Sequence, residues 1–241
     1  MNQANVYAKD VIIACDFNGR AELDAFLVKF AGEARKPYLK IGMELYYAEG
    51  PSVVRDVKAA GYRVFLDLKL HDIPTTVKKS MKVLSTLGVD MCNLHAAGTS
   101  AMMEAALEGL TRPDGSRPLL IAVTQLTSTD QSHMEKELLI NAPIDQVVMH
   151  YAQNARSAGL DGVVCSPLEA GKVKAVCGAD FVTVTPGVRF ADGDTGDQKR
   201  VTTPARARSL GSDYIVVGRP ITQAADPVAA YRRCAAEFLS E

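Results

Sequence analysis

The sequence predicts an α/β protein folded as one (β/α)8 barrel. Short apolar segments alternate with longer amphipathic segments along the 241 residues. Strands that alternate with helices form parallel βαβ units, and eight such units in a chain of this length fit a closed barrel better than an open sheet. A doubly wound sheet is the alternative, but no G-x-G-x-x-G follows the first apolar segment. No low-complexity linker divides the chain, so residues 1–241 are predicted to form a single domain.

Eight short apolar segments, each of strand length, are predicted to be the barrel strands. They are 11–17, 38–43, 63–70, 91–96, 119–126, 162–166, 181–187 and 214–219. Each is followed by a longer stretch in which the next helix can form.

The helical segments carry start and stop signals. In both 51–61 and 74–88 a proline stands first and a glycine last, as at the first turn and the C-terminal cap of a helix. The long gap 127–143 between the fifth and sixth strands is predicted to hold an extra short helix. Residues 188–201 are rich in glycine and aspartate and lack periodicity, which predicts a mobile loop.

Composition narrows the function class. The net charge is −1 and the pI about 6.4, which argues against a general nucleic-acid binder. The five cysteines are widely spaced and form no C-x-x-C, so reduced core thiols are predicted. The segment MNQANVYAKD has no apolar signal region, and no run approaches the ~18 apolar residues of a membrane span. A cytoplasmic protein with no membrane partner is therefore predicted.

Polar side chains gather at the C-terminal ends of the predicted strands, the rim where (β/α)8 barrels carry their chemistry. Taken alone, Asp16 could cap the first helix and Lys40 could extend to solvent. His95 fits a hydrogen-bonded structural histidine and is left out of the predicted site. No cluster has a trustworthy metal-ligand spacing, so no metal site is predicted. The rim residues are Asp16, Lys40, Asp67, Lys69, His95, Gln125, Thr127, Ser166, Pro186, Arg189, Gly218 and Arg219.

The segment FLDLKLHDIP, residues 65–74, places charge inside an apparent core strand. Asp67 and Lys69 are two residues apart and share one side of the strand. At ~4 Å and a dielectric constant of ~20 their attraction is about 4 kcal/mol before desolvation. Lys40 and Asp16 on neighbouring strand ends can extend the pair into an alternating network. Asp72 has the opposite parity; it could cap the next helix, which the residues alone favour, or reach a neighbouring subunit's site.

The stretch FLDLKLHDIPTTV, residues 65–77, resembles the D-x-K-x-x-D signature of the orotidine 5′-phosphate decarboxylase family. The resemblance extends over almost the whole chain, through CDF, LKIGMEL, VTQLTSTD, TPGVR and IVVGRPIT. It implies a (β/α)8 lyase that converts orotidine 5′-monophosphate to uridine 5′-monophosphate and CO2 without a metal or cofactor. This reaction is the last step of pyrimidine nucleotide (UMP) synthesis, and the resemblance also implies a homodimer.

Carried over to this chain, the resemblance assigns roles at the barrel mouth. Lys69 would donate the proton to C6 of the pyrimidine. Asp67 would lie beside the departing carboxylate, between Lys40 and Lys69. Asp16 and Lys40 would bind the ribose hydroxyls, and Thr127 would contact the pyrimidine ring.

The resemblance also implies contacts from the loops and from a second subunit. Asp72 and Thr76 would enter the site from the partner subunit of a homodimer. Residues 188–201 would form a lid, and the phosphate would be held at its ends and after the eighth strand. The substrate-binding residues implied there are Pro186, Arg189, Gln198, Gly218 and Arg219.

Two other functions are compatible with parts of the pattern. Related phospho-sugar barrels share D-x-K-x-x-D but bind Mg²⁺ through acids at the mouth. The segment TQLTS and the long loop between Arg189 and Gln198 favour a nucleotide substrate instead. A non-catalytic phosphate-binding barrel is the second alternative, and an intact Lys69 between Asp67 and Asp72 argues against it.

Overall fold

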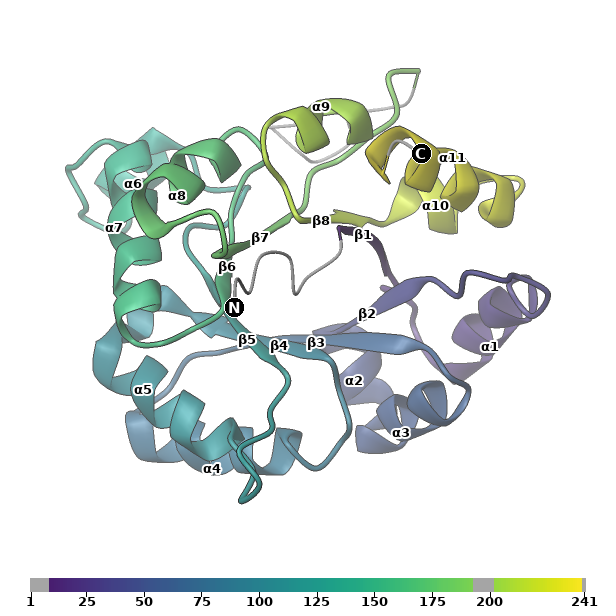
Figure 1. Ribbon diagram of the computed structural model, residues 1–241, viewed down its shortest axis with the longest axis horizontal. Helices are drawn as coiled ribbons and strands as arrows, with labels where there is room; N and C mark the ends of the chain where they lie inside the picture. Colours follow the sequence, from purple (N-terminus) through teal and green to yellow (C-terminus); the bar gives the residue numbers. More distant parts are fainter. Residues whose placement is uncertain (1–8, 193–201, 240–241) are drawn as a thin grey trace, which may run out of the picture.

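The computed structural model describes residues 9–192 and 202–239, in which eight parallel strands close into a barrel in chain order (Figure 1). This confirms the predicted (β/α)8 fold. The strands are β1 (Asp10–Ala14), β2 (Tyr38–Gly42), β3 (Arg63–Leu70), β4 (Met91–His95), β5 (Leu119–Val123), β6 (Gly162–Val164), β7 (Val182–Thr185) and β8 (Tyr214–Val217).

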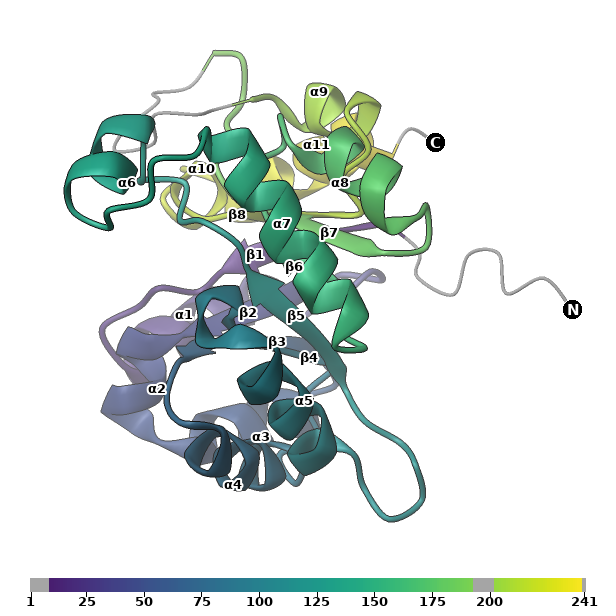
Figure 2. The same cartoon turned by 90° about the vertical axis from the view of Figure 1, so that its left-hand side faces the viewer.

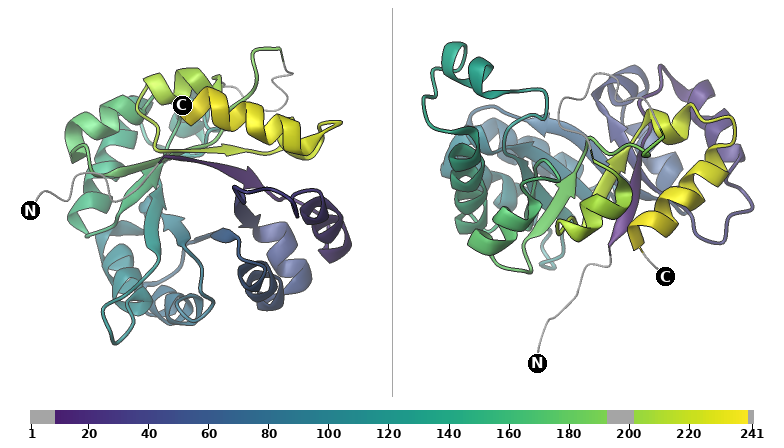
Figure 3. Two further views of the ribbon diagram at one scale, coloured as in Figure 1. Left: turned by 45° about the vertical axis from the view of Figure 1, so that its right-hand side comes forward. Right: turned by 90° about the horizontal axis from the view of Figure 1, so that it is seen from above.

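Helices surround the barrel on the outside (Figures 1 and 2). The short helix α6 lies in the gap 127–143, as predicted, and stands out from the ring of helices (Figures 2 and 3). The helices are α1 (Arg20–Val28), α2 (Met43–Glu49), α3 (Pro51–Ala59), α4 (Pro74–Leu84), the 3₁₀ turn η1 (Ala96–Gly98), α5 (Thr99–Leu110), α6 (Gln131–Lys136), α7 (Ile144–Ser157), α8 (Ala170–Cys177), α9 (Pro204–Ser209), α10 (Arg219–Thr222) and α11 (Pro227–Leu239).

Proline marked both predicted helix starts, and glycine marked one of the two predicted ends. Pro51 and Pro74 are the first residues of α3 and α4. Gly61 follows the last turn of α3 with a φ of 84°, in the left-handed region where glycine carries no steric cost. Helix α4 ends at Leu84, four residues before Gly88, so its predicted end was wrong.

Several strands are shorter than predicted, and they end before the polar rim residues. The first ends at Ala14 rather than at residue 17, and the fifth at Val123 rather than at residue 126. Asp16 and Gln125 therefore lie just beyond the ladder.

Two apolar layers hold the barrel. The larger lies between strands and helices, and the smaller fills the barrel interior with side chains such as Ile12, Phe65, Ile121 and Val182. Near the N-terminal end of the barrel the rings of Tyr38 and Tyr214 meet edge to face with centroids 6.1 Å apart. The N-terminal half of the barrel is thus filled, and a cavity can open only at the C-terminal rim.

All five cysteines, Cys15, Cys92, Cys165, Cys177 and Cys234, are buried, and none forms a disulfide. Burial raises the pKa of the Cys15 thiol to about 12, so this thiol stays protonated and behaves as a small apolar side chain. Within the described ranges, no helix combines the length and the apolar character needed to cross a membrane.

Candidate active site

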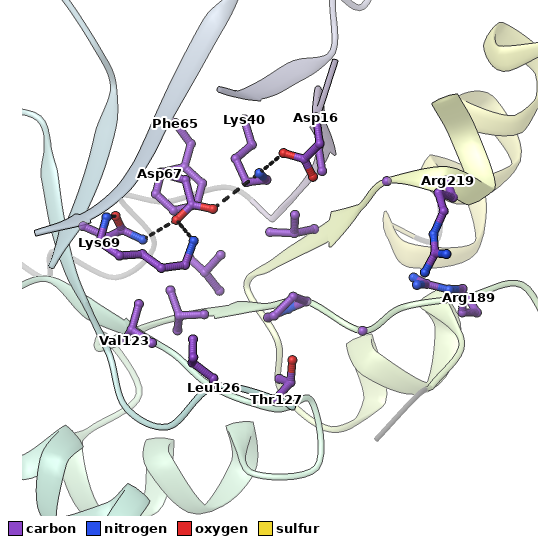
Figure 4. Close-up of a pocket in the computed structure, with 18 of the residues that line it drawn as sticks. Asp16, Lys40, Phe65, Asp67, Lys69, Val123, Leu126, Thr127, Arg189 and Arg219 are labelled. Atoms are coloured by element: carbon purple, nitrogen blue, oxygen red, sulfur yellow. Dashed lines mark hydrogen bonds and ion pairs between the residues drawn. The ribbon is translucent and has the colours of Figure 1, made fainter. Parts of the chain in front are cut away.

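A cavity of about 510 Å³ opens at the C-terminal end of the barrel. Charged side chains from β2 and β3 lie on one side of it, apolar side chains on another, and a pair of arginines at the far end (Figure 4). The predicted site residues that line it are Asp16, Lys40, Asp67, Lys69, Thr127, Pro186, Arg189, Gly218 and Arg219.

Four of these side chains form a line of alternating charge across the strand ends (Figure 4). The Lys40 ammonium lies 2.6 Å from the Asp16 carboxylate and 3.4 Å from that of Asp67. The Lys69 ammonium lies 2.7 Å from the other oxygen of Asp67. The structure therefore brings together the network that strand parity and neighbouring strand ends predicted.

The central members of the line remain charged although they are buried. Burial alone would raise the pKa of Asp67, but the positive charges of Lys40 and Lys69 hold it below its usual value. Burial would likewise lower the pKa of Lys40, but the carboxylates of Asp67 and Asp16 hold it above its usual value. Both groups are thus ionised at neutral pH, and each keeps its neighbour ionised.

Asn93 on β4 completes this cluster, and it was not predicted. Its Nδ2 donates to Asp67 Oδ1 at 2.7 Å, and its Oδ1 accepts from the backbone N–H of Lys69 at 2.8 Å. Asn93 follows Met91 by two residues, so its side chain shares the inward direction of a barrel-core residue. The signal that could have identified Asn93 in the sequence was a polar amide at a strand position that faces the barrel interior.

The backbone at Lys69 is strained. Its φ is 50°, in the left-handed region, and the pairing of β3 with β4 shifts register between Leu66 and Leu70. Such a conformation costs a lysine roughly 1–3 kcal/mol and is characteristic of functional sites. The hydrogen bond that the Lys69 backbone N–H donates to Asn93 Oδ1 stabilises this bend, and the Lys69 side chain lines the cavity.

The ion pair between Asp16 and Lys40 leaves no room for a side chain at Gly42. A β-carbon at this position would lie 2.8 Å from Asp16 Oδ1 and 3.0 Å from Lys40 Nζ. Any side chain here would therefore displace one member of the ion pair. Glycine at the end of β2 leaves the space through which Lys40 reaches Asp16.

The histidines near this end of the barrel lie beside the cavity rather than in its lining. The rings of His71 and His95 are tilted, with centroids 5.6 Å apart. Burial lowers the pKa of the half-buried His95, and the nearby His71 and Lys69 lower it further. His95 is thus kept neutral, and its structural role stays a prediction.

The wall facing the charges is apolar, with Val123, Leu126, Val164 and Val184 among its lining residues. Thr127 lies at its edge (Figure 4). A flat ring can pack here with one edge toward the Lys69 ammonium, because this wall offers contact without competing hydrogen bonds.

Arg189 and Arg219 extend toward each other at the far end of the cavity (Figure 4). Arg219 is the first residue of α10, and Gly218 precedes it. Two guanidinium groups at one end and an ammonium at the other suit a ligand with an anionic end group and a reacting centre at a distance.

Two predicted site residues, Asp72 and Thr76, are not part of this cavity in the single chain. Asp72 and Thr76 are exposed, and neither lines the cavity. The capping alternative for Asp72 is wrong: the residue before α4 is Ile73, and no side chain caps the helix. Gln198 and most of the predicted loop 188–201 lie outside the described residues. In the ranges that are described, no group of three His, Cys, Asp or Glu side chains could hold a metal ion.

Known proteins resemble this chain along nearly its full length. Residues 9–234 match the model of the orotidine 5′-phosphate decarboxylase / HUMPS family. A protein from Bacillus cytotoxicus named orotidine 5′-phosphate decarboxylase is 54% identical over 228 residues, 93% of this chain and 95% of that protein. One of the same name from Geobacillus thermodenitrificans is 54% identical over 230 residues, 94% of this chain and 95% of that protein.

Solved structures agree with the sequence matches. The crystal structure of orotidine 5′-phosphate decarboxylase from Lactobacillus acidophilus superposes with a TM-score of 0.85 at 41% identity, covering 95% of this chain and 99% of that one. An uncharacterized conserved protein from Geobacillus kaustophilus superposes with a TM-score of 0.84 at 49% identity, with the same coverage.

Proposed function

The chain belongs to the orotidine 5′-phosphate decarboxylase / HUMPS family, and from this premise we propose that it converts orotidine 5′-monophosphate to uridine 5′-monophosphate and CO2. The proposal places the chain in pyrimidine nucleotide synthesis, as a carboxy-lyase. The observation that carries it is the line of alternating charge from Asp16 to Lys69, which ends in an ammonium group at an open cavity.

The reaction needs positive charge near one carbon. When CO2 leaves C6, the bonding electron pair stays on a vinyl carbon that has no adjacent carbonyl to accept it. The Lys69 ammonium offsets this developing charge and then transfers a proton from Nζ to form the new C6–H bond. Lys69 is left neutral and regains its proton from solvent.

Asp67 gives the ammonium of Lys69 its position. It accepts hydrogen bonds from Lys69 and Asn93 and pairs with Lys40, so it cannot turn away without breaking all three contacts. Its carboxylate would also repel the substrate carboxylate, and this repulsion would fall once CO2 leaves. The orienting role alone is sufficient reason for a buried acid here.

The other lining residues would hold the rest of the substrate. Asp16 and Lys40 would bind the ribose hydroxyls, and Thr127 would contact the pyrimidine ring near Pro186. The phosphate would lie at the far end of the cavity. It would contact the backbone at Gly218 and the guanidinium groups of Arg189 and Arg219, with Gln198 from the segment 188–201 acting as part of a lid. Binding energy from this remote group can then be used in the transition state.

A homodimer would complete the site. Asp72, Ile73 and Thr76 follow β3 directly and are exposed, and the Ile73 side chain is 67% accessible. A second subunit packed on this segment would cover Ile73 and receive Asp72 and Thr76 into its own cavity. The cytoplasmic location expected from the sequence stays a prediction.

A direct assay tests the proposed reaction. The full chain, exhaustively treated with a chelator, is mixed with orotidine 5′-monophosphate, and the loss of the orotate absorbance is followed. We expect turnover to continue at an unchanged rate, since the charge at C6 comes from Lys69. Turnover that disappears on chelation and returns with Mg²⁺ would identify a metal-dependent phospho-sugar barrel, and no turnover in either state would overturn the proposal.

A further inference from the structure

Arg189 lies between two anchored stretches of backbone. On its N-terminal side Val188 bridges Thr202, and the backbone N–H of Arg189 donates to Thr202 O at 2.9 Å. Its guanidinium group lies beside that of Arg219 at the far end of the cavity (Figure 4). The backbone on the C-terminal side of Arg189 is supported as well.

That support comes from three residues, Phe190, Asp192 and Arg233, which we call the Arg233 clamp. Arg233 on α11 donates from both terminal nitrogens to the two carboxylate oxygens of Asp192, each at 3.0 Å. Its Cζ lies 4.3 Å from the centroid of the Phe190 ring. The segment after β7 passes beside α11 in Figure 3, where these contacts form.

The clamp is more firmly built than a single surface ion pair. Arg233 Nε donates to Glu237 one turn later on α11 at 2.9 Å, so all three nitrogens of the guanidinium group donate to a carboxylate. Phe190 in turn packs against the large apolar layer of the barrel. A bidentate pair, a cation–π contact and a third hydrogen bond together fix the orientation that an isolated pair leaves free.

The Arg233 clamp lies beside open space into which residues 190–192 could otherwise move. A second cavity of about 610 Å³ is lined by Arg189, Arg219 and all three clamp residues. Without the clamp, residues 190–192 could move into this space and Arg189 would follow. The position of Arg189 thus depends on a contact that does not itself reach the first cavity.

We propose that Arg233 is a positioning residue, which through Phe190 and Asp192 holds Arg189 ready for the phosphate monoester of a nucleotide. The inference rests on the proposed function, because it assumes that Arg189 binds a phosphate. It adds a determinant on α11, outside the cavity that holds the proposed reacting groups. Preorganising a binding group lowers the ordering cost of binding.

The test compares uridine 5′-monophosphate with uridine, which differ only in the phosphate. Their dissociation constants are measured by titration calorimetry on the full-length protein and on Arg233→Met, which keeps an unbranched side chain but removes the charge. We expect the nucleotide to bind about 10-fold more weakly to the variant and uridine to bind unchanged. Asp192→Asn should act in the same direction, and the double variant should be no weaker than Arg233→Met alone, because both changes break one contact.

Arg232→Met is the matched control. Arg232 precedes Arg233 on the same helix and also makes a two-point contact, with Glu33 away from both cavities. We expect it to change neither affinity. Equal nucleotide affinities in the two variants would overturn the role of the clamp, and so would an equal loss for uridine, which would indicate a general structural effect. A wild-type protein that binds both ligands equally would instead overturn the phosphate site of the proposed function.

Discussion

Lys69 has a left-handed backbone, an ammonium group bound to Asp67 and a backbone N–H bound to Asn93. In a regular strand its side chain would lie on the same face as that of Asp67. Here the register of the β3–β4 pairing shifts between Leu66 and Leu70, and the Lys69 side chain still lines the cavity with Asp67. The cost of the bend, roughly 1–3 kcal/mol, is offset by contacts that exist only when β3 and β4 are both in place.

Replacement of Lys69 tests its proposed chemical role. We expect Lys69→Ala to lower decarboxylation at least about 10³-fold, because both the proton donor and the charge near C6 are lost. The variant should remain folded and bind uridine 5′-monophosphate, since the arginines and the apolar wall are untouched. Steady-state kinetics and calorimetry measure the two effects. Lys79→Ala, at an exposed lysine of α4, is the control, and near-normal turnover in Lys69→Ala would contradict the mechanism.

The predictable part of the site followed from strand parity and strand order. Asp67 and Lys69 are two residues apart, and Lys40 lies on the neighbouring strand, so their meeting required only the barrel. Asn93 was missed because a neutral amide carries no charge that stands out in a core strand. The left-handed bend at Lys69 was not predictable either, because it depends on a hydrogen bond from another strand.

At the level of whole elements, Pro51 and Pro74 marked the starts of α3 and α4 and Gly61 marked the end of α3, whereas the pattern did not mark where the strands end. A helix end is marked locally, since only certain residues tolerate the backbone there. A strand end depends on where its neighbour stops pairing. The polar residues 16 and 125 continue the alternation of β1 and β5 but lie beyond the ends of these strands. A prediction from the sequence pattern alone therefore made both strands too long.

Helices α4 and α5 pack closely behind the strands that carry Lys69 and Asn93, and Gly109 is the point of contact. A β-carbon on Gly109 would lie 2.1 Å from the carbonyl oxygen of Lys78. Alanine usually improves a helix by about 1 kcal/mol over glycine, but here the helices would have to separate. We therefore expect Gly109→Ala to lower the free energy of unfolding by about 1–3 kcal/mol, measured by urea denaturation.

Gly32→Ala is the control for this packing effect, because a β-carbon there would meet no atom within 4 Å. Its free energy of unfolding should change by less than about 0.5 kcal/mol. If Gly109→Ala is as stable as the control variant, the close approach of α4 and α5 is not a determinant of stability.

For the whole molecule, closure of the barrel is what assembles the cavity. β1 pairs with both β2 and β8, which brings Asp16 beside Lys40 and the eighth-strand residue Gly218 to the same rim. In an open sheet with the same chain-order pairing, the first and last strands would lie at opposite edges. Because β8 pairs with β1, the arginine pair and the line of alternating charge can contact the same ligand.

The proposed homodimer is tested by mixing two inactive variants, Asp67→Ala and Asp72→Ala. If Asp72 acts in the partner's cavity, a mixed dimer contains one intact site, with Asp67 from one subunit and Asp72 from the other. Random exchange at equal amounts makes half of the dimers mixed, so we expect about a quarter of wild-type activity per subunit. Activity is measured after exchange is verified by mass spectrometry of the dimers.

Mixing Asp67→Ala with Lys69→Ala supplies the control for this experiment. Asp67 and Lys69 contact each other within one chain at 2.7 Å, so every site in this second mixture lacks one of them. We expect no activity to return. Recovery in the first mixture alone would assign Asp72 to the neighbouring subunit's site. Only then does a mixed dimer place both substitutions in one site and leave the other site intact. Equal absence of recovery in both, after proven exchange, would mean that Asp72 acts within its own subunit or that each chain works alone.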